Sequence, residues 1–316
     1  MIKTHQISYF LSIVENKSFN IAAEKLNISQ PALSKAMNDL EAKLSVKLID
    51  RLPKGVEPTE FGMILKKYSH LILSDISKVE KEINSLKDGT IGDVTIGVAF
   101  SPRIHLVPMA TINLQTKYPN INLKVFGGQR IDLLTNLLKG SVDLFVSAIV
   151  PDDIFFLEEA DNNTFQYLPL YKDTQHIVSR FDHPLQFKKK LRLSDTLNYN
   201  WILPEQEKTL RLFNLHEQFI KNNVEIPQPK ILHNSGNFAL NVIKNSNYLG
   251  IHPKQMIETQ KDGLVKILEI PGISMEPIYG ITYLKEKPLR KSAKLIVEEL
   301  SLVSKEMIHQ NLLKEI

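Results

Sequence analysis

The feature that most constrains this chain is the run of residues 18–59, whose spacing predicts two short helices separated by one tight turn. Ser18 can cap the first helix by accepting a hydrogen bond from an unpaired backbone N–H group. Ser29 offers a second cap, and Pro31 falls in the first turn of the second helix, where a missing N–H group costs nothing. We expect the remainder of the chain to position this compact unit.

The second helix, expected to run to Leu44, has two distinct faces. Its apolar residues recur at helical spacing and form the expected buried stripe of Leu33, Met37, Leu40 and Leu44. The opposite face carries Gln30, Ser34 and Asn38, four residues apart, with Lys35 beside them. Short side chains that donate and accept hydrogen bonds can enter the major groove of DNA and contact base edges. The alternative is an ordinary solvated helix face, which is the commoner meaning of a polar stripe.

The segment that follows this helix favours the DNA-binding interpretation. Two strand-like pieces, 46–49 and 56–58, flank Arg51, Lys54 and Gly55, as in a small hairpin. A basic hairpin beside a recognition helix suits contact with phosphates or with the minor groove, and we expect Arg51 and Lys54 to make those contacts. The full set of residues expected to contact DNA is Ser29, Gln30, Pro31, Ser34, Lys35, Asn38, Arg51 and Lys54.

This stretch closely resembles the winged helix-turn-helix of LysR-type transcriptional regulators. The family pattern S-F-x-x-A-A-E-x-L-x-[IV]-S-Q-P-A-L-S-x-x-[IM]-x-x-L-E-x-x-L is met by Ser18, Phe19, Ala22, Ala23, Glu24, Leu26, Ser29, Gln30, Pro31, Ala32, Leu33, Ser34, Leu40, Glu41 and Leu44. Two positions depart from it: the usual glycine after the recognition helix is Ser45, and the usual Phe-Glu-Arg of the wing is Ile49-Asp50-Arg51. Because the length and the downstream layout also fit, the resemblance covers nearly the whole chain.

The resemblance implies an α/β fold class with an N-terminal all-α winged helix-turn-helix and a sensor of two α/β lobes similar to type 2 periplasmic binding proteins. The expected domains are a DNA-binding domain at 1–58, a linker and dimerisation helix at 59–88, and an effector-binding sensor domain at 89–316. Lobe I is expected at about 90–163 and 269–305, and lobe II at about 164–268.

One long helix is predicted between the hairpin and the sensor. Apolar residues alternate spacings of three and four from Phe61 to Leu86, and Lys87-Asp88-Gly89 ends the pattern. A helix of about 40 Å with such a narrow apolar stripe needs another helix to cover it. We therefore expect a homodimer, and the family resemblance implies that dimers pair into a homotetramer that bends DNA.

From residue 90 onward the sequence predicts strands that alternate with helices. The strands expected in the first block are 94–98, 121–126 and 144–147, and a second block begins near Phe165. A strand at 277–283 and a helix from 289 to about 308 would bring the chain back to the first block.

Ligands of open α/β sheets bind beyond the carboxyl ends of the strands, and the resemblance places effector contacts at the same loops. The candidate effector-binding residues are Ser101, Pro102, Arg103, Gly128, Gln129, Arg130, Ser147, Lys208, Thr209, Asn234 and Ser235. The arginines among them favour a small anionic or polyhydroxylated effector bound between the lobes, with an arginine as a carboxylate clamp. Surface arginines and turn-capping hydroxyls explain each residue equally well when it is taken singly.

The composition and the missing motifs limit other classes of function. Lys+Arg 39 against Asp+Glu 35 gives a net charge of only +4, so DNA binding depends on local placement of basic residues. The count of Cys 0 excludes thiol chemistry and fits the cytoplasm, and no signal peptide or membrane-spanning run is found. The chain also lacks GxSxG, phosphate-loop, GxGxxG, HxxxH and HxH motifs, so we expect no enzyme activity, cofactor or metal site.

The sequence thus predicts a ligand-responsive transcription regulator. Its expected partners are double-stranded DNA, a small-molecule effector and, as a further possible partner, RNA polymerase. The alternative is a ligand-binding protein whose helical head contacts other proteins, and such a head would show no salt-dependent binding to duplex DNA. An enzyme built on the same two-lobed scaffold is a third interpretation, which turnover of a bound metabolite would reveal.

Overall fold

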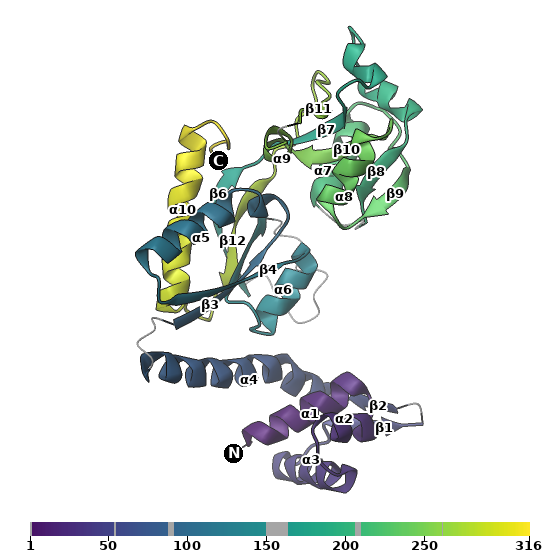
Figure 1. Ribbon diagram of the computed structural model, residues 1–316. Helices are drawn as coiled ribbons and strands as arrows, with labels where there is room; N and C mark the ends of the chain where they lie inside the picture. Colours follow the sequence, from purple (N-terminus) through teal and green to yellow (C-terminus); the bar gives the residue numbers. More distant parts are fainter. Residues whose placement is uncertain (1, 54, 88–91, 150–163, 206–209, 261) are drawn as a thin grey trace. The chain divides into compact units, whose positions relative to one another are not determined.

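The protein is α/β, with an all-helical N-terminal head that carries a small β-hairpin, as the sequence predicts (Figure 1). The computed structural model describes residues 2–53, 55–87, 92–149, 164–205, 210–260 and 262–316. The described residues fall into two compact units, the first within 1–92 and 138–141, and the second within 93–137 and 142–316.

Three helices build the head: α1 (Thr4–Asn16), α2 (Phe19–Lys25) and α3 (Gln30–Leu44). Both predicted caps are confirmed, because the Ser18 hydroxyl accepts a hydrogen bond from the Ile21 amide at 3.4 Å and the Ser29 hydroxyl accepts one from the Ala32 amide at 3.4 Å. Ser45 ends α3 in the left-handed conformation with φ 56°. A glycine would adopt this conformation more easily, which explains why the related pattern carries glycine there.

The three helices pack around one apolar core. Its buried members include Phe10, Ile13, Phe19, Ala22, Leu33, Met37, Leu40 and Leu48. Leu44, which we expected on the buried stripe of α3, is 36% exposed because it is the last residue of that helix. Helix α2 has only seven residues and buries Phe19, Ala22 and Ala23, so Ile21 is 47% exposed.

The hairpin consists of the antiparallel strands β1 (Ile49–Leu52) and β2 (Gly55–Pro58). The first strand was expected at 46–49, which is wrong by about three residues. The buried carboxylate of Glu41 accepts hydrogen bonds from the amides of Leu48 at 2.7 Å and Ile49 at 3.1 Å. Because the carboxylate holds these amides, the chain turns there and strand pairing begins only at Ile49.

Helix α4 (Glu60–Lys87) has 28 residues and follows the hairpin directly. Its first turns contact the head, where Leu65 packs against the core. Within this single chain its apolar stripe is largely exposed, at Phe61, Ile64, Tyr68, Ile72, Ile76, Val79 and Ile83.

The first lobe of the sensor is a five-stranded sheet of order β4-β3-β5-β12-β6. Its strands are β3 (Gly92–Val98), β4 (Ile121–Gly127), β5 (Leu144–Ala148), β6 (Phe165–Lys172) and β12 (Ile278–Leu284). Strands β3 and β5 are parallel, whereas β12 pairs antiparallel with both β5 and β6.

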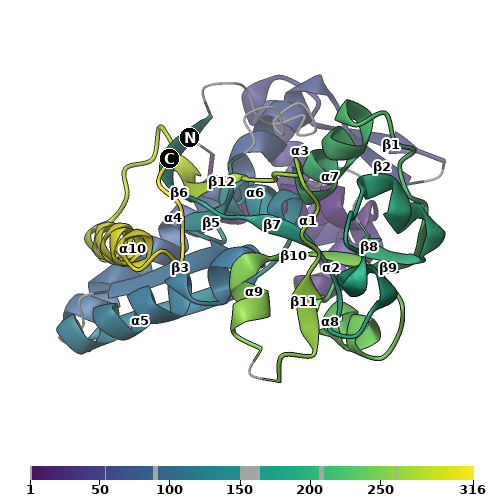
Figure 2. The same cartoon turned by 90° about the horizontal axis from the view of Figure 1, so that it is seen from above.

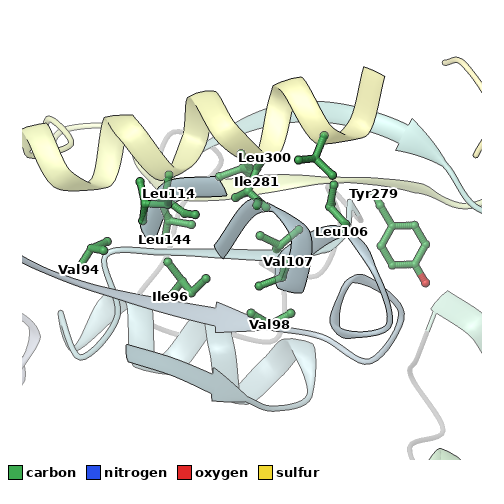
Figure 3. Close-up of a cluster of buried hydrophobic side chains, with 14 of the residues drawn as sticks. Val94, Ile96, Val98, Leu106, Val107, Leu114, Leu144, Tyr279, Ile281 and Leu300 are labelled. Carbon is green, nitrogen blue, oxygen red and sulfur yellow. The ribbon is translucent and has the colours of Figure 1, made fainter. Parts of the chain in front are cut away.

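Helices cover both faces of this sheet. On one face α5 (Leu106–Lys117) and α10 (Lys291–His309) lie alongside each other (Figure 2). They enclose the core drawn in Figure 3, which includes Val94, Ile96, Val98, Leu106, Val107, Leu114, Leu144, Ile281 and Leu300. On the other face α6 (Arg130–Leu138) packs so closely on β3 that a Cβ atom at Gly97 would lie 2.8 Å from Leu133 Cδ2.

The second lobe contains the antiparallel sheet β10-β7-β11 and the parallel pair β8-β9. Its strands are β7 (Gln175–Arg180), β8 (Trp201–Pro204), β9 (Pro229–His233), β10 (Gly250–Pro253) and β11 (Val265–Ile267), and its helices are α7 (Leu210–Lys221), α8 (Gly236–Lys244) and α9 (Lys254–Glu258). Trp201 is buried and meets the ring of Phe219 edge-on at 5.9 Å. The short elements α9 and β11 were not expected from the sequence.

The expected boundaries of the second lobe, 164 and 268, need correction. Strand β6 pairs with β12 along its length, so residues 165–172 belong to the first sheet and the chain crosses between lobes after Lys172. On the return, Leu268, Ile270 and Met275 still pack in the core of the second lobe. The pairing of β6 depends on a strand more than 100 residues away, which a local pattern cannot reveal.

We predict that Glu41→Leu destabilises the head by about 2–5 kcal/mol, because two buried amides lose their acceptor. Glu41→Gln should cost less, because both amides donate to the same oxygen, Oε1, and the amide oxygen of glutamine can take its place. Hydrogen exchange measures the effect directly, as lost protection of the Leu48 and Ile49 amides. Unchanged protection in Glu41→Leu would contradict this role.

Candidate nucleic-acid interface and ligand site

The polar face of α3 is accessible from solvent. The residues that the sequence singles out lie in its first three turns or at its N-cap: Ser29, Pro31, Lys35 and Asn38 are exposed, and Gln30 and Ser34 are half-buried. Donors, acceptors and one positive charge therefore share a surface narrow enough for the major groove. Its backbone is fixed from beneath by the buried side chains of Leu33, Met37 and Leu40.

Three of these polar residues form a network within the head. Gln30 Nε2 donates a hydrogen bond to Ser34 Oγ at 3.0 Å, and Arg51 Nη2 donates to the same oxygen at 3.4 Å. The Arg51 guanidinium carbon also lies 4.4 Å from the centroid of the Phe19 ring, in a cation–π contact. The hairpin is thus joined to the polar face of α3 through Arg51, while Lys54 lies outside the described residues.

The first group of candidate ligand residues follows β3. Residues Ser101–Arg103 form a short 3-10 helix, and Ser101 is buried. Its hydroxyl donates a hydrogen bond to the carboxylate of Asp173, which is also buried and lies between β6 and β7. The hydroxyl oxygen of Ser101 is therefore left as an acceptor.

A second group joins α6 to the end of β5. Gly128 and Gln129 precede α6, and Arg130 is its first residue. Arg130 Nη1 donates to Ser147 Oγ at 2.8 Å and to the Ala148 carbonyl at 2.7 Å, so Arg130 and Ser147 are brought together. Nη1 of Arg130, one of the arginines expected to clamp a carboxylate, is therefore bonded to the end of β5.

Arg103 lies beside these residues. Its Nε donates to the Ala99 carbonyl at 3.2 Å, and its guanidinium carbon lies 5.8 Å from the centroid of the Phe100 ring. A Cβ atom at Gly127 would collide with the guanidinium, so glycine there leaves room for the arginine. Burial lowers the pKa of Arg103 from its usual value.

In the second lobe the candidates follow β9. Ser235 caps α8 by accepting a hydrogen bond from the Phe238 amide at 3.4 Å, and Asn234 is exposed. Gly236, the first residue of α8, allows the ring of Phe100 to approach so closely that a Cβ atom would collide with it. This contact brings the loop after β3 close to the N-terminus of α8. Lys208 and Thr209 lie outside the described residues.

Sequence reasoning missed the polar side chains of the crossing segment, residues 171–175, where the chain passes from the first lobe to the second. Asp173 and Gln175 are buried there, and Tyr171 stacks on Tyr279 with the ring centroids 5.4 Å apart. Burial, and then the Asp173 carboxylate, raises the pKa of Tyr171 well above its usual value, so the phenol stays protonated near neutral pH. The signal in the sequence is an isolated Asp between two predicted strands.

Other kinds of site have no support from these residues. Among the described residues, no group of three or more His, Asp and Glu side chains could hold a metal ion. In the same part of the chain, no helix is both long enough and apolar enough to cross a membrane.

Two family models match this chain. Residues 4–63 match the model described as bacterial regulatory helix-turn-helix protein, lysR family. Residues 87–303, more than half of the chain, match the LysR substrate binding domain. Together the two matches leave few residues of the chain outside them.

Individual relatives and solved structures agree with these matches, and GbpR is named a transcriptional regulator. The chain is 27% identical over 306 residues to the HTH-type transcriptional regulator GbpR of Azospirillum brasilense, covering 96% of this chain and 87% of that protein. The structure of full-length CbnR complexed with its target DNA has a TM-score of 0.66 at 18% identity, covering 96% of this chain and 100% of that one. The effector binding domain of QuiR in complex with shikimate has a TM-score of 0.58 at 19% identity, covering 68% of this chain and 98% of that one.

Proposed function

This chain belongs to the LysR family of DNA-binding transcription regulators with an effector-binding domain, and we propose that its helix α3 reads operator bases in the major groove. The observation that carries the proposal is the accessible polar face of α3, with Gln30, Ser34, Lys35 and Asn38 supported by a buried apolar stripe. Such side chains donate to and accept from base edges. Lys54 in the adjoining hairpin would contact the DNA backbone or the minor groove.

Helix α4 supports a proposal about assembly. Its exposed apolar stripe is too long to remain in water, and a second copy of α4 would cover it. A homodimer presents two α3 helices, so the operator would be an interrupted palindrome with half-sites about one helical turn, or a multiple of it, apart. The family resemblance supports the further proposal that two dimers pair into a tetramer.

The effector is proposed to bind at the strand ends of the sensor, between its two lobes. The hydroxyl hydrogen of Ser101 is already donated to Asp173, so a ligand group that meets this oxygen must itself donate. Hydroxyl groups satisfy this requirement and carboxylates do not. Arg103 and Arg130 could hold a carboxylate elsewhere on the same ligand, which favours a small hydroxylated acid.

The DNA-binding proposal predicts different effects for α3 and for the hairpin. Gln30→Ala or Ser34→Ala should cost roughly 1–3 kcal/mol at matched bases, with little loss on other sequences. Lys54→Ala should weaken binding to all sequences alike and reduce the slope of log K against log salt by about one. Anisotropy titrations at several salt concentrations measure both quantities. Interchanged outcomes would contradict the assignment of helix and hairpin.

The assembly proposal predicts that a charge on the α4 stripe disrupts the dimer. Ile76 is 37% exposed in the single chain, and Ile76→Lys should shift the sedimentation of the full chain toward the monomer. Ser77→Lys places the same charge on an exposed neighbour outside the stripe and is the matched control. Equal dimer dissociation constants for these two variants would argue against pairing through α4.

The effector proposal predicts thermal stabilisation of the full chain by small hydroxylated carboxylates. Shikimate is a suitable first probe because it carries hydroxyl groups and a carboxylate. Calorimetry should then find binding weakened about tenfold by Ser101→Ala, which removes one acceptor. Undiminished binding in both Arg103→Ala and Arg130→Ala would exclude the arginine clamp, and no stabilisation by any member of the class would exclude the ligand class.

A further inference from the structure

The side chain of Arg51, a residue of strand β1, reaches from the hairpin to the polar face of α3. Its backbone pairs with Val56 in the hairpin, and its guanidinium contacts both Phe19 and Ser34. Phe19 is buried in the core of the head, so its ring is a fixed platform beneath the charge. The guanidinium is therefore positioned before any DNA is present.

The consequence for Ser34 follows from the hydrogen-bonding capacity of a hydroxyl group. A serine hydroxyl donates one hydrogen bond and accepts two. Ser34 Oγ accepts from Gln30 Nε2 at 3.0 Å and from Arg51 Nη2 at 3.4 Å, which uses both acceptor positions. A guanidinium can only donate, so this contact always takes a lone pair from Ser34. Only the hydroxyl hydrogen of Ser34 is left for DNA.

We propose that Arg51 is a positioning residue that makes Ser34 a reader of hydrogen-bond acceptors, so that Ser34 selects against cytosine at the base it meets. This inference rests on the proposed function of α3. In the major groove guanine, adenine and thymine all present acceptors, whereas cytosine presents an amino donor. A Ser34 hydroxyl with both lone pairs occupied cannot accept from that amino group.

A direct phosphate contact by Arg51 is the competing role, and the two roles give different results on removal of the side chain. A phosphate contact contributes equally to all sequences and adds about one to the salt slope. A residue that acts through Ser34 changes the preference among bases at one position and leaves the salt slope nearly unchanged. Its effect must also disappear when Ser34 is absent, because the two residues act as one unit.

The probe is a duplex that the full-length wild-type protein selects from a randomised pool, together with its set of single-base variants. Dissociation constants are measured at several salt concentrations for wild type, Arg51→Ala, Ser34→Ala and the double variant. In wild type we expect about tenfold discrimination against cytosine at one position. In Arg51→Ala this should fall to about twofold or less, with a change in salt slope well below one. The double variant should bind no more weakly than Ser34→Ala.

Arg51→Lys keeps the positive charge. It is measured beside Arg51→Ala, because a folding defect in Arg51→Ala would also abolish discrimination. A lysine lacks the planar fork that lies over Phe19 and reaches Ser34, so discrimination should be lost while the salt slope is retained. Lys25→Ala, which removes an exposed head charge that contacts Asn16, is the control and should keep the discrimination.

Three results would overturn the inference: additive costs in the double variant, a salt slope lowered by about one in Arg51→Ala, or full discrimination in both Arg51 variants. The wild-type result distinguishes a failure of the role given to Arg51 from a failure of the proposed function of α3. If the wild-type protein enriches no duplex from the pool, the proposed function of α3 fails. If it enriches one and any of those three results appears, only the role given to Arg51 fails.

Discussion

The carboxylate of Glu41 is the contact on which the arrangement of the DNA-binding head depends. It lies in the last turns of α3 and accepts hydrogen bonds from the amides of Leu48 and Ile49, which would otherwise be buried without a partner. These two bonds fix the direction in which the chain leaves α3 and enters β1. Arg51 follows two residues later, so the same anchor determines that its guanidinium reaches Phe19 and Ser34. The polar face of α3 and the hairpin are therefore joined before any partner binds.

The features of this head that could be predicted from sequence are those that depend on contacts between residues within one helical turn of each other. Ser18 and Ser29 cap the two helices because each hydroxyl needs only an amide three residues later, and Pro31 fits the first turn for an equally local reason. The start of β1 could not be predicted in this way. Residues 46–49 have strand propensity, but a carboxylate seven residues earlier holds the Leu48 amide. A contact across a turn thus overrides the local preference.

The proposed ligand site also combines local and long-range features. The rule about strand ends predicted Ser101, Ser147 and Arg130 as candidates, and the last two are bonded to each other. It could not identify Asp173, which is the partner of Ser101 but lies 72 residues further along the chain. The position of Asp173 depends on the pairing of β6 with β12, and that pairing moves the crossing point from the expected residue 163 to Lys172. Long-range strand pairing therefore decides which side chains complete the site.

The position of Asp173 also indicates how a ligand could act. This residue lies between β6 and β7, strands of different sheets, so its bond to Ser101 ties the end of β3 to a segment that crosses between the lobes. A ligand that donates to Asp173 competes with this bond, whereas a ligand that donates to the Ser101 oxygen reinforces it. Either ligand shifts the population of conformations at residues 171–175. Any such shift that alters operator affinity is reciprocal, because the free energy of coupling belongs to both binding events. Bound operator must then change the affinity for the effector by the same factor, and equal effector affinity with and without operator would restrict the ligand to steps after DNA binding.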